Sequence, residues 1–267
     1  SDVVGVLTFD RTSDSPVGVF PERRAHQRTV PLADVWDNFG FDPATGNAMI
    51  ATAGLAARKY RIERNEVDEL AHLRYQQYYE ARDSGLLDRV LVPLDVLNLQ
   101  GRLRGRVEAD VGVRQLSLGG FRAMRELDPC VTPGTQTHAS DGMATLLVTS
   151  EGPARELSPR PEIDIRPVAK AEVRTSTSLM PEAPSLAVRK LLKRVGLGMG
   201  DVAVVKCHNP FAVNDAIFAK LLEYDWSQMN RTGCSLGWGH PQGPTLTRLL
   251  IEGLEEAVSL GGGHVQV

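Results

Sequence analysis

A glycine- and proline-rich segment between Asn230 and Arg248 constrains the fold of this chain most strongly. It reads Asn-Arg-Thr-Gly-Cys-Ser-Leu-Gly-Trp-Gly-His-Pro-Gln-Gly-Pro-Thr-Leu-Thr-Arg, so its glycines permit positive φ and its prolines stiffen the backbone around His240. Leucines then recur at helical spacing from Thr245 on, which predicts a buried amphipathic helix. A rigid loop that holds one imidazole at a helix N-terminus is suited to binding developing negative charge. The alternative is a tight turn whose histidine has no chemical role.

Composition narrows the class of protein. The 267 residues are 42% hydrophobic and 24% charged with a net charge of −3, which is typical of a globular chain of one or two domains. This charge does not favour a nucleic-acid partner, and no apolar run has the length of a membrane span. The three cysteines lack metal-ligand spacing, which indicates a reducing compartment. We therefore expect a cytoplasmic protein without a bound metal.

Alternating strand and helix patterns predict a layered α/β fold. Apolar periodicity predicts strands at 2–9, 163–165, 168–173, 201–206 and 261–267 and one that ends at Thr149, and helices at 49–60, 65–84, 115–127 and 185–195. The strand at 2–9 is predicted to be buried, and its position at the chain start suggests a fragment. Asn65 and Asp68 are predicted to cap their helix, and the proline-rich residues 152–161 to form a linker.

Three segments together resemble one protein family. The Asn230–Arg248 segment is similar to the thiolase signature Asn-x-x-Gly-Gly-x-x-x-x-Gly-His-Pro-x-Gly-x-(Ser/Thr)-x-x-Arg, although Thr232 and Cys234 replace an asparagine and a glycine. Residues 131–144 resemble, without a gap, the thiolase run Val-Thr-Ala-Gly-Asn-x-Ser-x-x-Asn-Asp-Gly-Ala-Ala. Residues 49–71 resemble the thiolase loop domain, where a glycine at position 54 replaces the usual glutamate.

The resemblance implies a division into domains. The chain corresponds to roughly the last two thirds of a thiolase subunit, which implies a thiolase-like layered αβαβα fold that is incomplete in its N-terminal half. Residues 1–9 and 128–151 then belong to the N-terminal thiolase domain, residues 10–127 to the CoA-binding loop domain, and residues 160–267 to the C-terminal thiolase domain.

The resemblance also implies an activity and partners. It implies an acyltransferase of fatty-acid or lipid metabolism, such as β-oxidation, that cleaves a 3-oxoacyl-CoA by thiolysis or performs the reverse Claisen condensation. Coenzyme A is then a substrate, and no cofactor is expected. The expected partners are acyl-CoA, CoA and further copies of the chain in a dimer or tetramer, with the need for an accessory small subunit left open. The alternative is a non-catalytic thiolase-like subunit that binds acyl-CoA or a partner protein.

Two histidines are the predicted catalytic residues. His208 follows the buried strand at 201–206, and strand ends are where sites form in open α/β sheets. The resemblance implies that His208 and His240 form an oxyanion hole for the thioester oxygen, and that His240 also helps to generate a nucleophilic thiolate. The alternative for His208 is a histidine that is hydrogen-bonded within the core.

The resemblance gives further candidates for substrate binding. Thr137 takes the place of a serine that contacts the pantetheine arm of CoA in thiolases. The other residues predicted to bind substrate or CoA are Met49, Phe211, Gly239 and Gly243. The basic pair Arg23 and Arg24 is a candidate for contacts with ligand phosphates, or alternatively belongs to a solvated surface.

The cysteines match neither catalytic position of the family. Thiolases use one cysteine as nucleophile and a second as acid/base, and the resemblance places both outside residues 1–267. Cys234 shares a loop with His240, which makes it a candidate for a substitute nucleophile. Small buried apolar side chains are the alternative for Cys130, Cys207 and Cys234.

Overall fold

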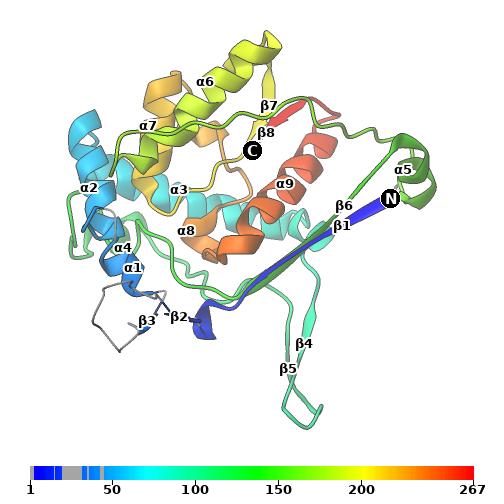
Figure 1. Cartoon of the computed structure of the whole chain (residues 1–267), viewed down its shortest axis with the longest axis horizontal. Helices are drawn as coiled ribbons and strands as arrows, with labels where there is room; N and C mark the ends of the chain where they lie inside the picture. Colours follow the sequence, from blue (N-terminus) through cyan, green and yellow to red (C-terminus); the bar gives the residue numbers. More distant parts are fainter. Residues whose placement is uncertain (1–2, 15, 20–31, 35, 43–44) are drawn as a thin grey trace, which may run out of the picture.

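The computed structural model describes residues 3–14, 16–19, 32–34, 36–42 and 45–267 (Figure 1). The strands are β1 (Val3–Asp10), β2 (Val17–Val19), β3 (Leu32–Asp34), β4 (Leu94–Leu97), β5 (Leu103–Val107), β6 (Gly142–Thr149), β7 (Val202–Val205) and β8 (His264–Gln266). The α-helices are α1 (Asp37–Gly40), α2 (Met49–Tyr60), α3 (Arg64–Asp83), α4 (Leu118–Arg122), α5 (Glu151–Leu157), α6 (Ala183–Val195), α7 (Ala212–Leu222), α8 (Ser235–Trp238) and α9 (Gln242–Ser259). Short 3-10 turns lie at Thr12–Asp14, Leu87–Arg89, Met180–Glu182, Met199–Asp201 and Trp226–Gln228.

The main hydrophobic core lies where α2, α3 and α7 meet (Figure 1). Val67, Leu70 and Ala71 recur at helical spacing on α3, and all three are fully buried. They belong to the same core cluster as Ala216 and Ile217 of α7, a helix that is buried nearly all round. These helices therefore form a rigid base for the loop that follows β7 and for the segment around α8.

Helix α9 packs against two pairs of strands. In the described part of the chain the strands form four two-stranded sheets, of which β1–β6 is antiparallel and β7–β8 is parallel. Helix α9 packs against both of these pairs. A Cβ at Gly253 of α9 would lie 2.9 Å from Val265 Cγ1 and 3.2 Å from Lys206 Cγ, so the missing side chain permits close helix–sheet packing.

The prediction that β1 is buried is wrong. Leu7 is 60% exposed and Phe9 is 74% exposed. Side chains alternate between the two faces of a strand, and α9 covers only the face that carries Thr8, whose Oγ1 lies 3.2 Å from Thr247 Oγ1. The opposite face, with Met143 and Leu147 of β6, is solvent-exposed in this chain.

Several local predictions also need correction. Residues 163–165 and 168–173 form no strand, because they find no ladder partner within the described chain. Most of α5 lies within the predicted linker, and the helix expected at 115–127 is limited to α4. Helix α3 begins after Glu63 without a side-chain cap, and Asp68 accepts from Arg64 Nε at 2.8 Å instead of capping the helix. The predicted division into domains stays a prediction.

Candidate active site

His208 and His240 lie face to face. Their ring centroids are 4.0 Å apart with an angle of 30° between the planes. His208 follows the end of β7, and His240 follows residues 232–239, all of which are buried. Both imidazoles are partly exposed, so they lie where the buried loop reaches the surface. The structure confirms the predicted proximity of the two rings, and their chemical roles stay predictions.

The His240 ring is held from one side by the first turn of α9. Its Nδ1 lies 2.7 Å from Thr245 Oγ1, and Thr245 Oγ1 in turn donates to the Pro241 carbonyl at 2.6 Å. The preceding residue, Gly239, has φ +90°, and a Cβ there would lie 1.7 Å from Ser140 Oγ. Only glycine therefore fits at this position, which makes the approach of the 138–140 segment to the loop possible.

The His208 ring is held by the first residue of α8. Its Nδ1 lies 3.0 Å from Oγ of Ser235, a fully buried residue. The Ser235 carbonyl accepts from Thr137 Oγ1 at 2.6 Å, and the Thr137 amide donates to the Pro210 carbonyl at 2.7 Å. The predicted pantetheine-contact residue therefore lies beside the histidine pair, and its hydroxyl proton is already used within the protein.

Both rings are kept neutral by their surroundings. Burial and the neighbouring His240 ring lower the pKa of His208 to about 3. Burial also lowers the pKa of His240, against an opposing contribution from Asp10. At neutral pH each ring thus has one N–H and one free lone pair, which is the state needed to accept a proton from an acid or to donate a hydrogen bond.

This arrangement predicts that acid destabilises the fold through His208. In the unfolded chain the imidazole titrates near its ordinary pKa of about 6.5, whereas in the folded chain the pKa is about 3. The unfolded state therefore binds more protons between these values, and the free energy of unfolding falls as pH falls through that window. In urea titrations we expect the free energy of unfolding of His208→Gln to fall less steeply between pH 7 and pH 5 than that of the unaltered chain. The slope should be smaller by up to about 1.4 kcal/mol per pH unit. His264→Gln, an exposed substitution on β8, serves as the control for the introduced glutamine.

A buried polar network supports the strand end that carries His208. Asp215 and Arg74 form an ion pair at 2.8 Å, and both side chains are fully buried. Asp215 Oδ2 also accepts from Asn209 Nδ2 at 2.8 Å and from Asn230 Nδ2 at 3.3 Å. Asn230 Oδ1 accepts from the Cys207 amide at 2.9 Å, so the network fixes the backbone on both sides of the loop. Sequence reasoning missed this pair because Arg74 and Asp215 are distant in the chain.

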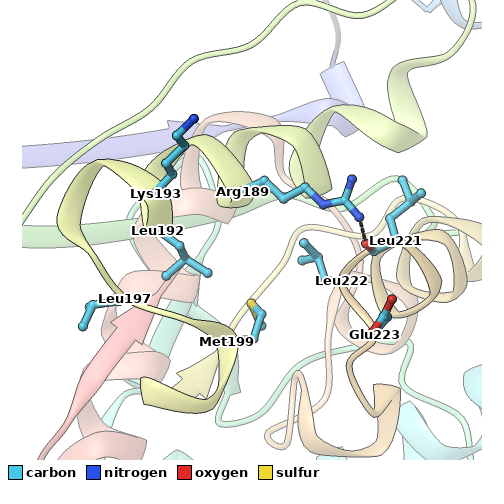
Figure 2. Close-up of a pocket in the computed structure, with 8 residues that line it drawn as sticks. All are labelled: Arg189, Leu192, Lys193, Leu197, Met199, Leu221, Leu222 and Glu223. Atoms are coloured by element: carbon cyan, nitrogen blue, oxygen red, sulfur yellow. Dashed lines mark hydrogen bonds between the residues drawn. The ribbon is translucent and has the colours of Figure 1, made fainter.

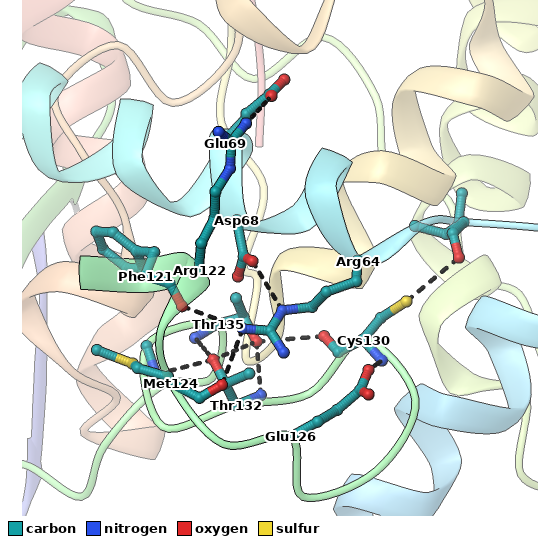
Figure 3. Close-up of polar contacts among 12 residues, drawn as sticks. Arg64, Asp68, Glu69, Phe121, Arg122, Met124, Glu126, Cys130, Thr132 and Thr135 are labelled. Carbon is teal, nitrogen blue, oxygen red and sulfur yellow. Dashed lines mark hydrogen bonds and ion pairs between the residues drawn. The ribbon is translucent and has the colours of Figure 1, made fainter. Parts of the chain in front are cut away.

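A second set of contacts anchors the segment that leads to Thr137 (Figure 3). The guanidinium of Arg64 donates to the carbonyls of Phe121 and Met124 at 3.0 and 3.2 Å, and so ties α4 to α3. Further along, the Thr132 amide donates to Thr135 Oγ1 at 2.8 Å and closes a turn. These contacts hold residues 118–135 against α3, just before the segment that contacts α8.

The other residues predicted to bind substrate or CoA lie on separate elements of the structure. Met49 begins α2 and packs on the same core cluster that contains Phe211, which is 6% exposed. A Cβ at Gly243 would lie 3.2 Å from the Phe9 carbonyl oxygen, so this glycine allows α9 to approach β1 closely. The predicted phosphate contacts of Arg23 and Arg24 fall outside the described residues.

The space beside Gly54 is filled by a residue from another segment. A Cβ at Gly54 would lie 1.8 Å from Asp128 Oδ1, so the Asp128 carboxylate occupies the space of a side chain at that position. Arg58 lies 3.8 Å from the same oxygen. An acidic residue from a different segment thus lies directly against α2 at Gly54.

The cysteines have the environment of structural residues. Cys234 is fully buried, its Sγ accepts from Asn209 Nδ2 at 3.0 Å, and burial raises the pKa of its thiol to about 12. Burial likewise raises the pKa of Cys130 to about 11 and raises that of Cys207. A thiol in such surroundings holds its proton at neutral pH, so these environments do not favour a nucleophilic thiolate.

A hollow of about 350 Å³ lies away from the histidines, between α6 and α7 (Figure 2). Its lining residues are Arg189, Leu192, Lys193, Leu197, Met199, Leu221, Leu222 and Glu223. The Arg189 guanidinium donates to the Leu221 carbonyl across it. None of the predicted site residues that the structure describes lines this hollow.

Comparisons with known proteins agree with the fold. Residues 22–152 match the thiolase N-terminal domain family, and residues 161–264 match the thiolase C-terminal domain family. Among solved structures, the human mitochondrial 3-ketoacyl-CoA thiolase in complex with CoA aligns with a TM-score of 0.83 at 24% identity, over 98% of this chain and 66% of that one. The Bacillus anthracis acetyl-CoA acetyltransferase also aligns at 0.83, over 98% of this chain and 67% of that one. The predicted α/β fold class is thereby confirmed as a thiolase fold.

Relatives in sequence lead to the same family. The chain is 31% identical over 219 residues to a 3-ketoacyl-CoA thiolase of Idiomarina loihiensis, which covers 78% of this chain and 56% of that protein. It is 30% identical over 216 residues to "Probable acetyl-CoA acetyltransferase" of Dictyostelium discoideum, which covers 79% and 51%. The chain belongs to the thiolase superfamily. It spans a little over half the length of these two relatives.

Among the described residues, no helix is long and apolar enough to cross a membrane.

Proposed function

We propose that this chain supplies the two-histidine part of a thiolase active site, and that the protein cleaves a 3-oxoacyl-CoA by thiolysis or performs the reverse condensation. The observation that carries this proposal is the stacked His208–His240 pair at 4.0 Å, in a chain of the thiolase superfamily. Relatives named 3-ketoacyl-CoA thiolase and acetyl-CoA acetyltransferase support the same acyltransferase class.

The chemistry assigns separate tasks to the nucleophile and the histidines. A cysteine thiolate attacks the 3-oxo carbon, the C2–C3 bond breaks, and its electron pair passes to the enolate of acetyl-CoA while the acyl group is held as a thioester. An acid then protonates C2, and the thiolate of free CoA takes the acyl group. His240 accepts the proton of the nucleophilic thiol, and the two imidazoles stabilise the enolate oxygen.

Substrate binding is assigned to the surface around this pair. We place the pantetheine arm beside Thr137 and Gly239, with Met49 and Phe211 further along the same core. Coenzyme A is the substrate, without a separate cofactor, and the proposed protein is a cytoplasmic homo-oligomer of fatty-acid metabolism. The CoA complex of the human mitochondrial neighbour supports CoA as the ligand class.

A second candidate function is a non-catalytic thiolase-like subunit that binds acyl-CoA or a partner protein. It is favoured by the three cysteines, which are all buried and whose thiols all have a raised pKa. The first proposal therefore requires a nucleophile outside residues 1–267, whereas the second requires none.

Thiolytic cleavage of a 3-oxoacyl-CoA tests both candidates. The purified 267-residue chain and its Cys234→Ser variant are expected to show no turnover, because none of the three thiols is poised to ionise. The complete protein is expected to turn over. Activity of the chain that Cys234→Ser abolishes would make Cys234 the nucleophile. An inactive complete protein that still binds acyl-CoA would establish the second candidate.

A further inference from the structure

The hydrogen bonds around Thr245 determine which nitrogen of His240 carries the proton. Thr245 is 2% exposed and lies in the first turn of α9. Its Oγ1 is 2.6 Å from the Pro241 carbonyl oxygen and 2.7 Å from His240 Nδ1. A hydroxyl group has a single proton, so it donates to only one of these two neighbours.

The carbonyl is the neighbour that receives the hydroxyl proton. A carbonyl oxygen has no proton of its own, and a threonine within a helix commonly donates to the carbonyl four residues earlier. If the Thr245 hydroxyl proton pointed to His240 instead, Thr245 Oγ1 and the Pro241 carbonyl oxygen would lie 2.6 Å apart with no hydrogen between them. The hydroxyl therefore accepts from His240, and Nδ1 must carry the hydrogen.

We propose that Thr245 is a positioning residue that fixes neutral His240 as the Nδ1–H tautomer and leaves the lone pair on Nε2. The proposal deepens the proposed function and rests on it for its catalytic consequence. Burial of Thr245 excludes water as a competing partner, and stacking on His208 holds the plane of the ring. Nε2 can then take the proton of the attacking thiol and, as N–H of the imidazolium, donate to the enolate oxygen.

The tautomer can be measured in the 267-residue chain without any turnover. We expect ¹⁵N NMR at pH 8 to show a protonated Nδ1 and an unprotonated Nε2 for His240, assigned by comparison with His240→Gln. Thr245→Ser, which keeps the hydroxyl, should give the same pattern. Thr245→Val, which keeps the shape and removes the acceptor, should shift the ring toward Nε2–H. An Nε2–H ring in the unaltered chain would overturn the proposal, even if Thr245→Val failed to fold.

Thr247 offers a matched control on the same helix. It is 6% exposed and its Oγ1 lies 3.2 Å from Thr8 Oγ1, so Thr247→Val removes a buried hydroxyl of similar burial from α9. The His240 tautomer should not change in this variant. A shift in Thr247→Val equal to that in Thr245→Val would assign the effect to helix packing and overturn the proposal.

Turnover by the complete protein then tests the catalytic consequence separately. Thr245→Val should lower kcat about 10- to 100-fold with little change in KM, the scale seen when a partner that orients a metal-bound histidine is removed. Thr245→Ser should restore most of the rate. If His240 is the Nδ1–H tautomer but the complete protein is inactive, the positioning role of Thr245 stands and the proposed function is wrong. A full rate in Thr245→Val, with the tautomer shifted, would refute the catalytic consequence.

Discussion

Replacing His240 by alanine in the complete protein is expected to lower the rate of thiolysis by about two to three orders of magnitude. The ring is one of the two neutral imidazoles of the stacked pair and has two proposed tasks, acceptance of the thiol proton and donation to the enolate oxygen. Because the enolate charge develops only in the transition state, the loss should appear in kcat and should hardly affect acyl-CoA binding.

Steady-state kinetics and equilibrium binding of an acyl-CoA check this expectation together. His264→Ala is the matched control, since that histidine is exposed on β8 and should leave kcat unchanged. Equal losses in binding and turnover for His240→Ala would indicate a structural role for the loop histidine instead.

The largest loss of stability is expected for Asp215→Ala. Arg74 is fully buried, and the substitution would leave its guanidinium without the carboxylate that lies 2.8 Å away. Removing one partner of a buried ion pair typically costs about 3–5 kcal/mol, and here Asn209 and Asn230 lose an acceptor as well. The free energy of unfolding in urea measures this loss.

Asp83→Ala provides the contrast for that measurement. Asp83 pairs with Arg82 at 2.7 Å, but the Asp83 side chain is 67% exposed, and exposed pairs contribute no more than about 1 kcal/mol. Similar losses in the two variants would show that the Arg74–Asp215 pair is not the structural support described here. A loss confined to Asp215→Ala would confirm that the strand end before His208 depends on it.

Helices with strong local periodicity could be predicted from the sequence. The expected helix at 49–60 coincides with α2, and the expected helix at 185–195 lies within α6. The apolar run of β7 lies between clear turn residues, and β8 lies within the strand predicted at 261–267. The two helices depend on residues that are close in the chain, and for this reason the sequence pattern contains the necessary information.

Elements whose state depends on distant partners were predicted less well. An apolar run such as 163–165 becomes a strand only if another strand pairs with it, and none does among the described residues. The burial of β1 was likewise overestimated, because its exposure is set by what covers each face of the β1–β6 pair. Residues 152–161 contain prolines and were predicted as a linker, yet a single proline at the start of a short helix is tolerated in α5.

The sequence by itself determined the family resemblance and the identity of the two candidate histidines, because the Gly-His-Pro loop and the residues after β7 are contiguous motifs. Only the tertiary structure decided that the rings stack at 4.0 Å, that Ser235 and Thr245 hold them, and that Arg74 and Asp215 support them. It also decided that Cys234, although close to His240 in sequence, is enclosed beside Asn209. Hydrogen bonds and burial join residues far apart in the chain, and no local pattern records which of them will meet.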